Sequence, residues 1–82
     1  MENYSSENDK GFGVTGYQIG DDYIILMFKH RYKYKYSYRS CGQEHVENMK
    51  DLARQQKGLT TYKNQHNPAY EWKVDMGGRA AA

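Results

Sequence analysis

The chain has 82 residues, a mean hydropathy of −1.09 and a formal net charge of +2. This length leaves room for one domain and excludes a second core. The charge is too small to establish a polyanion partner, and the sequence pI of 8.6 lies below the strongly basic range typical of nucleic-acid modules. Nine tyrosines, two phenylalanines and one tryptophan supply apolar area, so we predict a folded domain with a thin core that a homo-oligomer would stabilise further.

The sequence indicates no secretion signal and no membrane span. Residues 1–10 have neither a basic nor an apolar region, and the longest apolar run, 23–28, is too short for a bilayer. The lone Cys41 cannot close an intramolecular disulfide or a paired-cysteine zinc motif. We therefore expect a cytoplasmic protein with a flexible acidic arm (1–10), one domain (11–73) and a flexible tail (74–82).

The first half of the domain is predicted to form strands. Alternating β-permissive residues from Phe12 to Ile19 precede the turn signal Gly20-Asp21-Asp22. The next strand, 23–29, is apolar on both faces, which is typical of a central strand.

Residues 31–39 show the strongest pattern, a nearly perfect alternation with period 2. One face carries Tyr32, Tyr34, Tyr36 and Tyr38, and the other carries Arg31, Lys33, Lys35, Ser37 and Arg39. Because only Lys29 and His30 separate this strand from the preceding one, we predict an antiparallel hairpin.

A helix is predicted to follow. Ser40 and Gln43 have the spacing of a capping box, so the helix should begin near Gly42 and stop at Gly58. Its apolar stripe is Val46, Met49, Leu52 and Ala53, with Lys50 exposed. The remaining segment reads as a short helical turn and then an extended piece, with Pro68 interrupting any longer helix. The expected class is α+β, with about three antiparallel strands and one main helix.

Two groups of residues are candidates for binding. The first is the basic face Arg31, Lys33, Lys35 and Arg39, whose cations could meet phosphates while flanking aromatic rings stack bases. The bland alternative is a solvated strand face. We expect Tyr34 and Tyr36 to be core residues and Tyr32 and Tyr38 to lie at the rim.

The second group mixes amides with flat aromatic rings. It comprises Tyr62, Asn64, His66, Asn67, Tyr70 and Trp72, which could close a pocket against the strand. The alternative is an ordinary polar loop pinned by Trp72. Asn and aromatic side chains can read base edges and faces, so this loop is where ligand specificity is expected.

Catalysis has little support in the sequence. His30, His45 and His66 have no metal-ligand spacing, Cys41 has no nucleophile signature, and 11–16 matches no phosphate-binding loop. We expect no enzyme activity, no cofactor and no metal.

The order of these motifs resembles the KTSC domain, which occurs at the C-terminus of some lysyl-tRNA synthetases and as a stand-alone protein in bacteria and phages. The matching residues are Gly16-Tyr17, Leu26 to Phe28, Tyr34-Lys35-Tyr36, Val46 to Ala53, Gly58, Tyr62-Lys63-Asn64 and Tyr70. The chain departs from the pattern in lacking a glycine turn before Tyr34 and a proline before the helix. The resemblance implies a small sheet carrying a helix, and RNA binding.

Three functions follow as hypotheses. The first is a non-catalytic module that binds an anionic nucleotide-type partner, RNA above all, through the basic and aromatic strand. The second is a phage anti-defence sponge, an oligomer that sequesters a nucleotide second messenger in pockets between subunits. The third is a protein-interaction domain that pairs through the tyrosine-rich strand.

Overall fold

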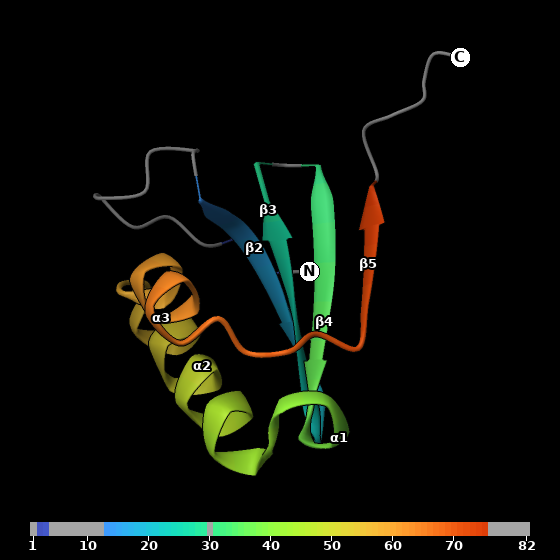
Figure 1. Cartoon of the computed structure of the whole chain (residues 1–82). Helices are drawn as coiled ribbons and strands as arrows, with labels where there is room; N and C mark the ends of the chain where they lie inside the picture. The colour runs from blue at the N-terminus through green and yellow to red at the C-terminus, as the bar shows by residue number, and fades with distance from the viewer. Residues whose placement is uncertain (1, 4–12, 30, 76–82) are drawn as a thin grey trace.

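The computed structural model of the chain describes residues 2–3, 13–29 and 31–75. The elements in chain order are β1 (Glu2–Asn3), β2 (Val14–Ile19), β3 (Tyr23–Phe28), β4 (Tyr32–Ser37), α1 (Tyr38–Cys41), α2 (Gln43–Gln55), α3 (Leu59–His66) and β5 (Trp72–Asp75). The strands form one antiparallel sheet in the order β1-β2-β3-β4-β5 (Figure 1). The predicted α+β class is confirmed, and β5 and the short β1 extend the sheet beyond the strands that we predicted.

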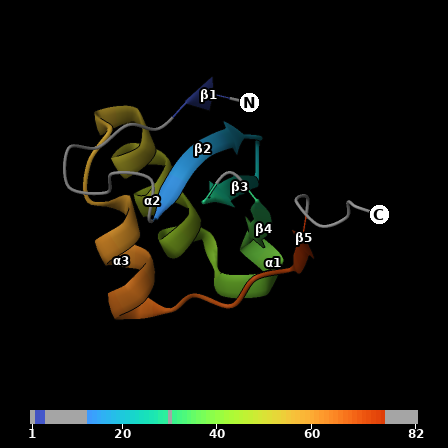
Figure 2. The ribbon, with the colours of Figure 1, turned by 90° about the horizontal axis from the view of Figure 1, so that it is seen from above.

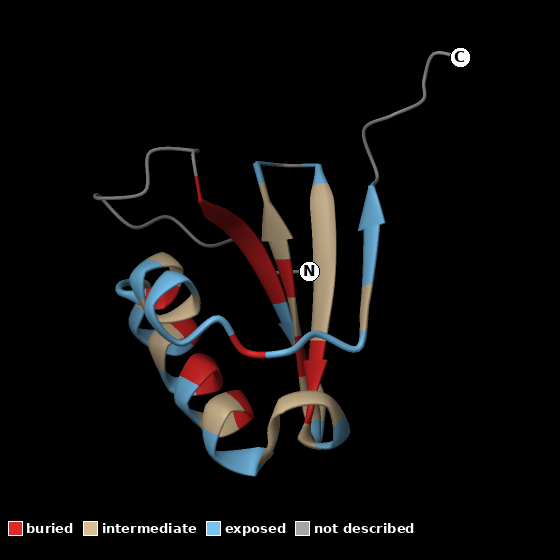
Figure 3. Cartoon of the chain, in the orientation of Figure 1, coloured by how far each residue is buried: buried red, intermediate tan, exposed pale blue. Residues whose placement is uncertain are grey.

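The helices lie on one side of the sheet (Figure 2). On this side Ile24 is paired with Tyr36, and Leu26 is paired with Tyr34. The core consists of fully or almost fully buried side chains from the sheet and from α2 and α3: Val14, Tyr17, Ile24, Leu26, Tyr36, Val46, Met49, Ala53 and Leu59. Buried residues accordingly line the inner surfaces of sheet and helices (Figure 3). The alternation along β3 and β4 therefore divides their residues between this core and the opposite face, whereas the bulge in β2 interrupts its alternation.

The predicted strand 31–39 is too long at both ends. Arg31 lies in the loop after β3, where its N–H donates to the Phe28 carbonyl at 2.9 Å. At the other end, the Ser37 side chain accepts from the Ser40 N–H at 3.2 Å, and Ser40 Oγ accepts from the Ser37 N–H at 3.0 Å. This capping box begins α1 at Tyr38. The predicted box of Ser40 with Gln43 is therefore wrong, and Tyr38 and Arg39 leave the strand.

The helical stripe is confirmed, but the helix stop is not where we predicted it. Val46, Met49 and Ala53 are fully buried, and Leu52 packs against the core. The left-handed residue that ends α2 is Gln56, with φ of 61°. Gly58, with φ of 80°, instead precedes α3.

The C-terminal part contains the predicted helical turn, α3, and the predicted extended piece, β5. Of the predicted arm 1–10, Glu2–Asn3 form β1, and the rest lies outside the described residues. Of the predicted tail 74–82, the first two residues belong to β5, and 76–82 lie outside the described residues. His30, one of the two predicted loop residues, is also outside them.

Lys50 is buried rather than exposed, which corrects the sequence prediction. It is 4% exposed, and its Nζ donates to the Asp21 carbonyl and to Glu47 Oε2, both at 2.9 Å. The same carboxylate accepts a hydrogen bond of 2.6 Å from the Tyr38 hydroxyl. This network ties the turn between β2 and β3 to α2 and to the start of α1. A buried ammonium is tolerated here because it has both a carbonyl and a carboxylate partner.

Met49 provides the test of the core. Met49→Ala removes a fully buried side chain and leaves a cavity, so the free energy of unfolding should fall by about 2 to 5 kcal/mol. Lys57→Ala, at an exposed position, is the control and should change it by less than about 0.5 kcal/mol. Urea denaturation followed by circular dichroism measures both variants. Equal losses would show that α2 does not pack through this face.

Glu47 provides a test of the Lys50 network by pH. Hydrogen bonds from Tyr38 and from Lys50 hold the pKa of Glu47 below its usual value of 4.5. The stabilisation from the ionised carboxylate is therefore complete above about pH 4.5 and is lost as the pH falls through the lower folded-state pKa. Urea denaturation of the native chain and of Glu47→Gln should give a stability difference that is constant near neutrality and shrinks below that pH. A difference that stays constant into strong acid would contradict the network.

Candidate functional site

The lysines of β4 face away from the helices. Because Tyr32, Tyr34 and Tyr36 point to the helices, the alternation sends Lys33 and Lys35 to the other side. We call this side of the sheet the open face. The register places the following side chains on it: Tyr23, Ile25, Met27, Lys33, Lys35, Trp72 and Val74.

Cations and aromatic rings are interleaved on the open face. Lys35 lies directly opposite Trp72 on β5, and its Nζ is 4.6 Å from the centroid of the Tyr23 ring. Lys35 Nζ is also 3.9 Å from Glu71 Oε2, a partly exposed pair that contributes little to stability. Lys33 lies two positions along β4, opposite Val74. The face thus combines two ammonium groups, two large aromatic rings and several aliphatic side chains.

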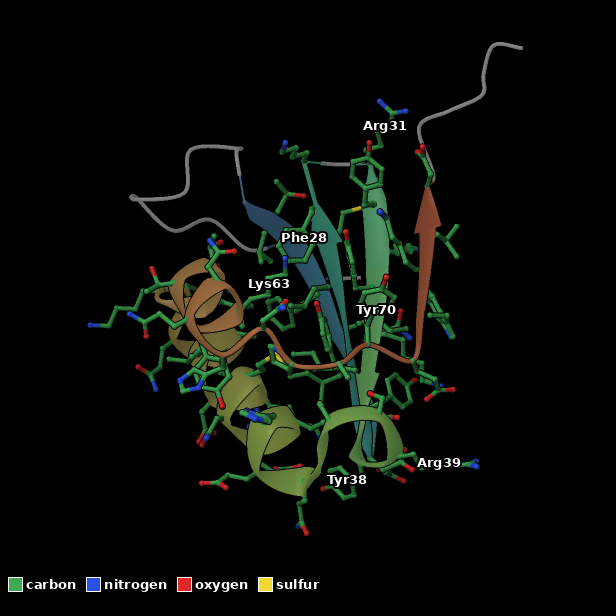
Figure 4. All side chains as sticks on the ribbon, viewed as in Figure 1. Phe28, Arg31, Tyr38, Arg39, Lys63 and Tyr70 are labelled. Atoms are coloured by element: carbon green, nitrogen blue, oxygen red, sulfur yellow. The ribbon has the colours of Figure 1, made fainter. Side chains whose placement is uncertain are left out.

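The other two cations of the predicted basic face lie elsewhere. Arg31 forms a two-point ion pair with Asp75, at 2.9 and 3.1 Å, beside the hairpin loop. Arg39 is exposed on α1, at the opposite end of β4 from Arg31 (Figure 4). The prediction of a row of four cations is wrong, because the strand ends before Arg39 and Arg31 is held by Asp75.

The predicted cluster in the C-terminal segment is divided among three places. Tyr62 faces α2, where its hydroxyl contacts His45 Nδ1 at 2.7 Å and accepts from Asn48 Nδ2 at 3.3 Å. Asn64 and Tyr70 lie on the helix side of the sheet, and Trp72 lies on the open face. These residues therefore do not close one pocket, because β5 pairs with β4 and turns Trp72 away from α3. The His66 ring packs against Tyr62 at a tilt of 35°, with ring centroids 4.3 Å apart, and Asn67 is the left-handed residue that ends α3.

The tyrosines of β4 change from core to surface along the strand. Tyr36 is 0% exposed, as predicted, and its hydroxyl has no hydrogen-bond partner among the described residues. Burial raises the pKa of this phenol. Tyr34 is partly buried and packs edge-on against both Phe28 and Tyr70, with centroids 5.1 Å apart in each pair. Tyr32 is partly exposed, near the hairpin loop.

A cavity of about 270 Å³ lies on the helix side, which we call the helix-side pocket. Rings of Phe28, Tyr32 and Tyr34 line it from the sheet. Thr60, Lys63 and Asn64 of α3, Lys29 of the hairpin loop and Gly13 complete the lining. Sequence reasoning found only Asn64 of this set as a binding residue. A lysine at position 63, between Tyr62 and Asn64, could have been considered as a binding residue. Its place in the pocket depends on where α3 packs on the sheet, which the sequence does not reveal.

Reactive chemistry has few candidates in the described part of the chain. Residues 13–29 and 31–75 contain no group of three or more His, Cys, Asp or Glu side chains that could hold a metal ion. Burial raises the pKa of the Cys41 thiol, which donates to the Ser37 carbonyl at 3.6 Å, so the nucleophilic thiolate is disfavoured. None of the helices in these ranges is both long enough and apolar enough to cross a bilayer.

Comparisons of the chain with protein-family models, with curated proteins and with solved structures found no match. The resemblance to the KTSC domain therefore stays a prediction. Any functional assignment depends on the open face and the helix-side pocket themselves.

Proposed function

We propose that the protein is a non-catalytic module that binds single-stranded RNA on the open face of its sheet. The observation that carries this proposal is the position of Lys35, whose ammonium lies over the Tyr23 ring and whose backbone pairs with Trp72. Lys35 therefore places a cation beside two aromatic side chains, which is the combination that contacts phosphates and stacks bases of a single strand.

The energetics of single-strand binding favour such a surface. Stacking of a base on an aromatic side chain is worth about 1 to 3 kcal/mol, and it tolerates any base because every base has a flat face. Antiparallel sheets that display aromatic rings on an uncovered face are an established way to hold splayed bases of RNA. Tyr23 and Trp72 would supply the rings here, and Lys33 and Lys35 would contact phosphates.

The same features make this face a poor surface for self-association. If two copies met face to face, their Lys33 and Lys35 ammonium groups would be brought together and lose water. Taking ammonium groups out of water is costly even for Lys35, whose ion pair with Glu71 is long, and like charges repel at short range. A flexible polyanion with planar rings satisfies the cations and covers Ile25, Met27 and Val74 at the same time.

A charge-matched pair of double variants tests the proposal. Lys33→Ala with Lys35→Ala removes two cations from the open face, whereas Arg39→Ala with Lys57→Ala removes two exposed cations from α1 and from the segment between α2 and α3. Binding of a fluorescent oligouridylate is followed by anisotropy over a range of salt concentrations. Only the first variant should lose affinity, and its salt slope should fall by roughly 0.7 for each phosphate contact removed.

The outcome that contradicts the proposal is equal binding by the two double variants, with circular dichroism showing that both are folded. In that case the lysines of β4 form only a solvated face. A salt slope near zero in the native chain, with saturation at a fixed ratio of nucleotide to protein, would instead indicate a small-nucleotide binder such as the sponge.

A further inference from the structure

We propose that the helix-side pocket is a second, separate site, which binds a nucleoside monophosphate group. It lies across the sheet from the open face, and its assignment does not rest on RNA binding there. The ligand is defined by two parts, a planar base against the aromatic floor and a phosphate against the lysines.

The walls of the pocket are fixed by a close approach of two distant segments. The Val14 N–H donates to Thr60 Oγ1 at 3.1 Å, which ties the start of β2 to α3. Gly13 makes this approach possible, because a Cβ at that position would overlap the Thr60 side chain. A site with walls already held in place requires less ordering when a ligand binds.

The floor of the pocket is an ordered group of aromatic rings. Tyr34 is held edge-on by Phe28 and by Tyr70, and it is nearly parallel to Tyr36, with centroids 6.3 Å apart and an interplanar angle of 11°. Figure 4 shows Phe28, Lys63 and Tyr70 around the same region between α3 and the sheet. Packing on three sides restricts the Tyr34 ring, so its remaining surface is a prearranged platform for a flat ligand.

The charge around the pocket is positive. Lys63 Nζ lies 5.2 Å from the Phe28 centroid and 5.6 Å from the Tyr34 centroid. Lys73 approaches Tyr32 and Tyr34 from β5, at 5.3 and 5.6 Å. Lys29 belongs to the lining, which includes no acidic side chain. Within the described ranges, none of the four ion pairs involves any of these three lysines.

The volume selects the size of the ligand. A cavity of about 270 Å³ lies just below the usual range for ligand pockets, so it suits one nucleotide better than a dinucleotide. Thr60 and Asn64 supply hydroxyl and amide groups for the polar edge of a base or ribose. A free nucleotide and the 5′-phosphorylated end of an RNA strand both present this group, so either can supply the ligand.

The Lys63 ammonium can exchange its contacts with aromatic rings for contacts with a phosphate. Its ammonium now lies over the rings of Phe28 and Tyr34, a cation–π position worth less than a charge-assisted bond to phosphate. A phosphate at the mouth would draw the flexible lysine stem outward and free the ring faces for the base. The pocket would thereby take up base and phosphate together.

The test uses variants that keep the backbone. Lys29 has φ of 57°, which Asn tolerates, so Lys29→Asn with Lys63→Gln removes both lining cations with little strain. The charge-matched control is Lys33→Gln with Lys35→Gln on the open face. Isothermal titration with adenosine monophosphate should show binding to the native chain and to the control, and binding weakened by about tenfold or more in the pocket variant.

Three further titrants complete the experiment. Adenosine and inorganic phosphate, each carrying half of the ligand, should bind much more weakly than the monophosphate. An RNA oligomer with a 5′-phosphate that competes with the monophosphate, while its 5′-hydroxyl form does not, would identify a strand end as a source. Absence of binding by the free monophosphate together with equal binding of the 5′-phosphorylated and 5′-hydroxyl oligomers would overturn the proposal, as would equal affinity for the monophosphate in the pocket variant and the control. Because the control variant removes the RNA-binding lysines, either proposal can fail without the other.

Discussion

The register between β3 and β4 pairs Ile24 with Tyr36 and Leu26 with Tyr34, and every functional assignment depends on it. These four side chains belong to the face that α2 covers. The intervening residues of β4, Lys33 and Lys35, must then lie on the other face. A slip of one residue would bury both ammonium groups beneath α2 and expose the tyrosines, at a cost that fixes the register.

A second constraint on the fold is the buried ammonium group of Lys50, which fastens α2 to the sheet. It joins the Asp21 carbonyl in the turn before β3 to the Glu47 carboxylate, which also binds the Tyr38 hydroxyl. Three parts of the fold, the turn between β2 and β3, α1 and α2, therefore share one polar network at one end of the sheet. The helix-side pocket lies toward the other end of the sheet, where Lys29 of the β3–β4 hairpin loop belongs to its lining.

Local patterns predicted β2, β3, β4 and α2, whereas the sites depend on tertiary contacts. The alternation in β4 and the stripe of Val46, Met49 and Ala53 are visible in the sequence because burial on one face imposes a period. The side of the sheet on which Trp72 lies is not visible in the sequence, because it depends on the pairing of β5 with β4 across three intervening helices. Arg31 could not be assigned to Asp75 for the same reason.

The helix-side pocket was even less predictable from the sequence than the open face. Its lining comes from the start of β2, the β3–β4 hairpin and α3, which no periodicity connects. Gly13 carries no local turn signal that would reveal its contact with Thr60. The burial of Lys50 was also not predicted. Its side chain lies next to the apolar stripe of α2 and was expected to face solvent, whereas the turn at Asp21 covers it in the structure.

The proposed RNA site and the proposed nucleotide site lie on opposite faces of β4, and fluorescence of the single tryptophan distinguishes them directly. Trp72 lies on the open face, across the sheet from the helix-side pocket. Its fluorescence should therefore be quenched when a short oligouridylate with a 5′-hydroxyl stacks on it, and should stay nearly constant when adenosine monophosphate saturates the pocket. Quenching of Trp72 fluorescence by adenosine monophosphate in the absence of RNA would contradict this account, and so would unchanged fluorescence under saturating oligouridylate.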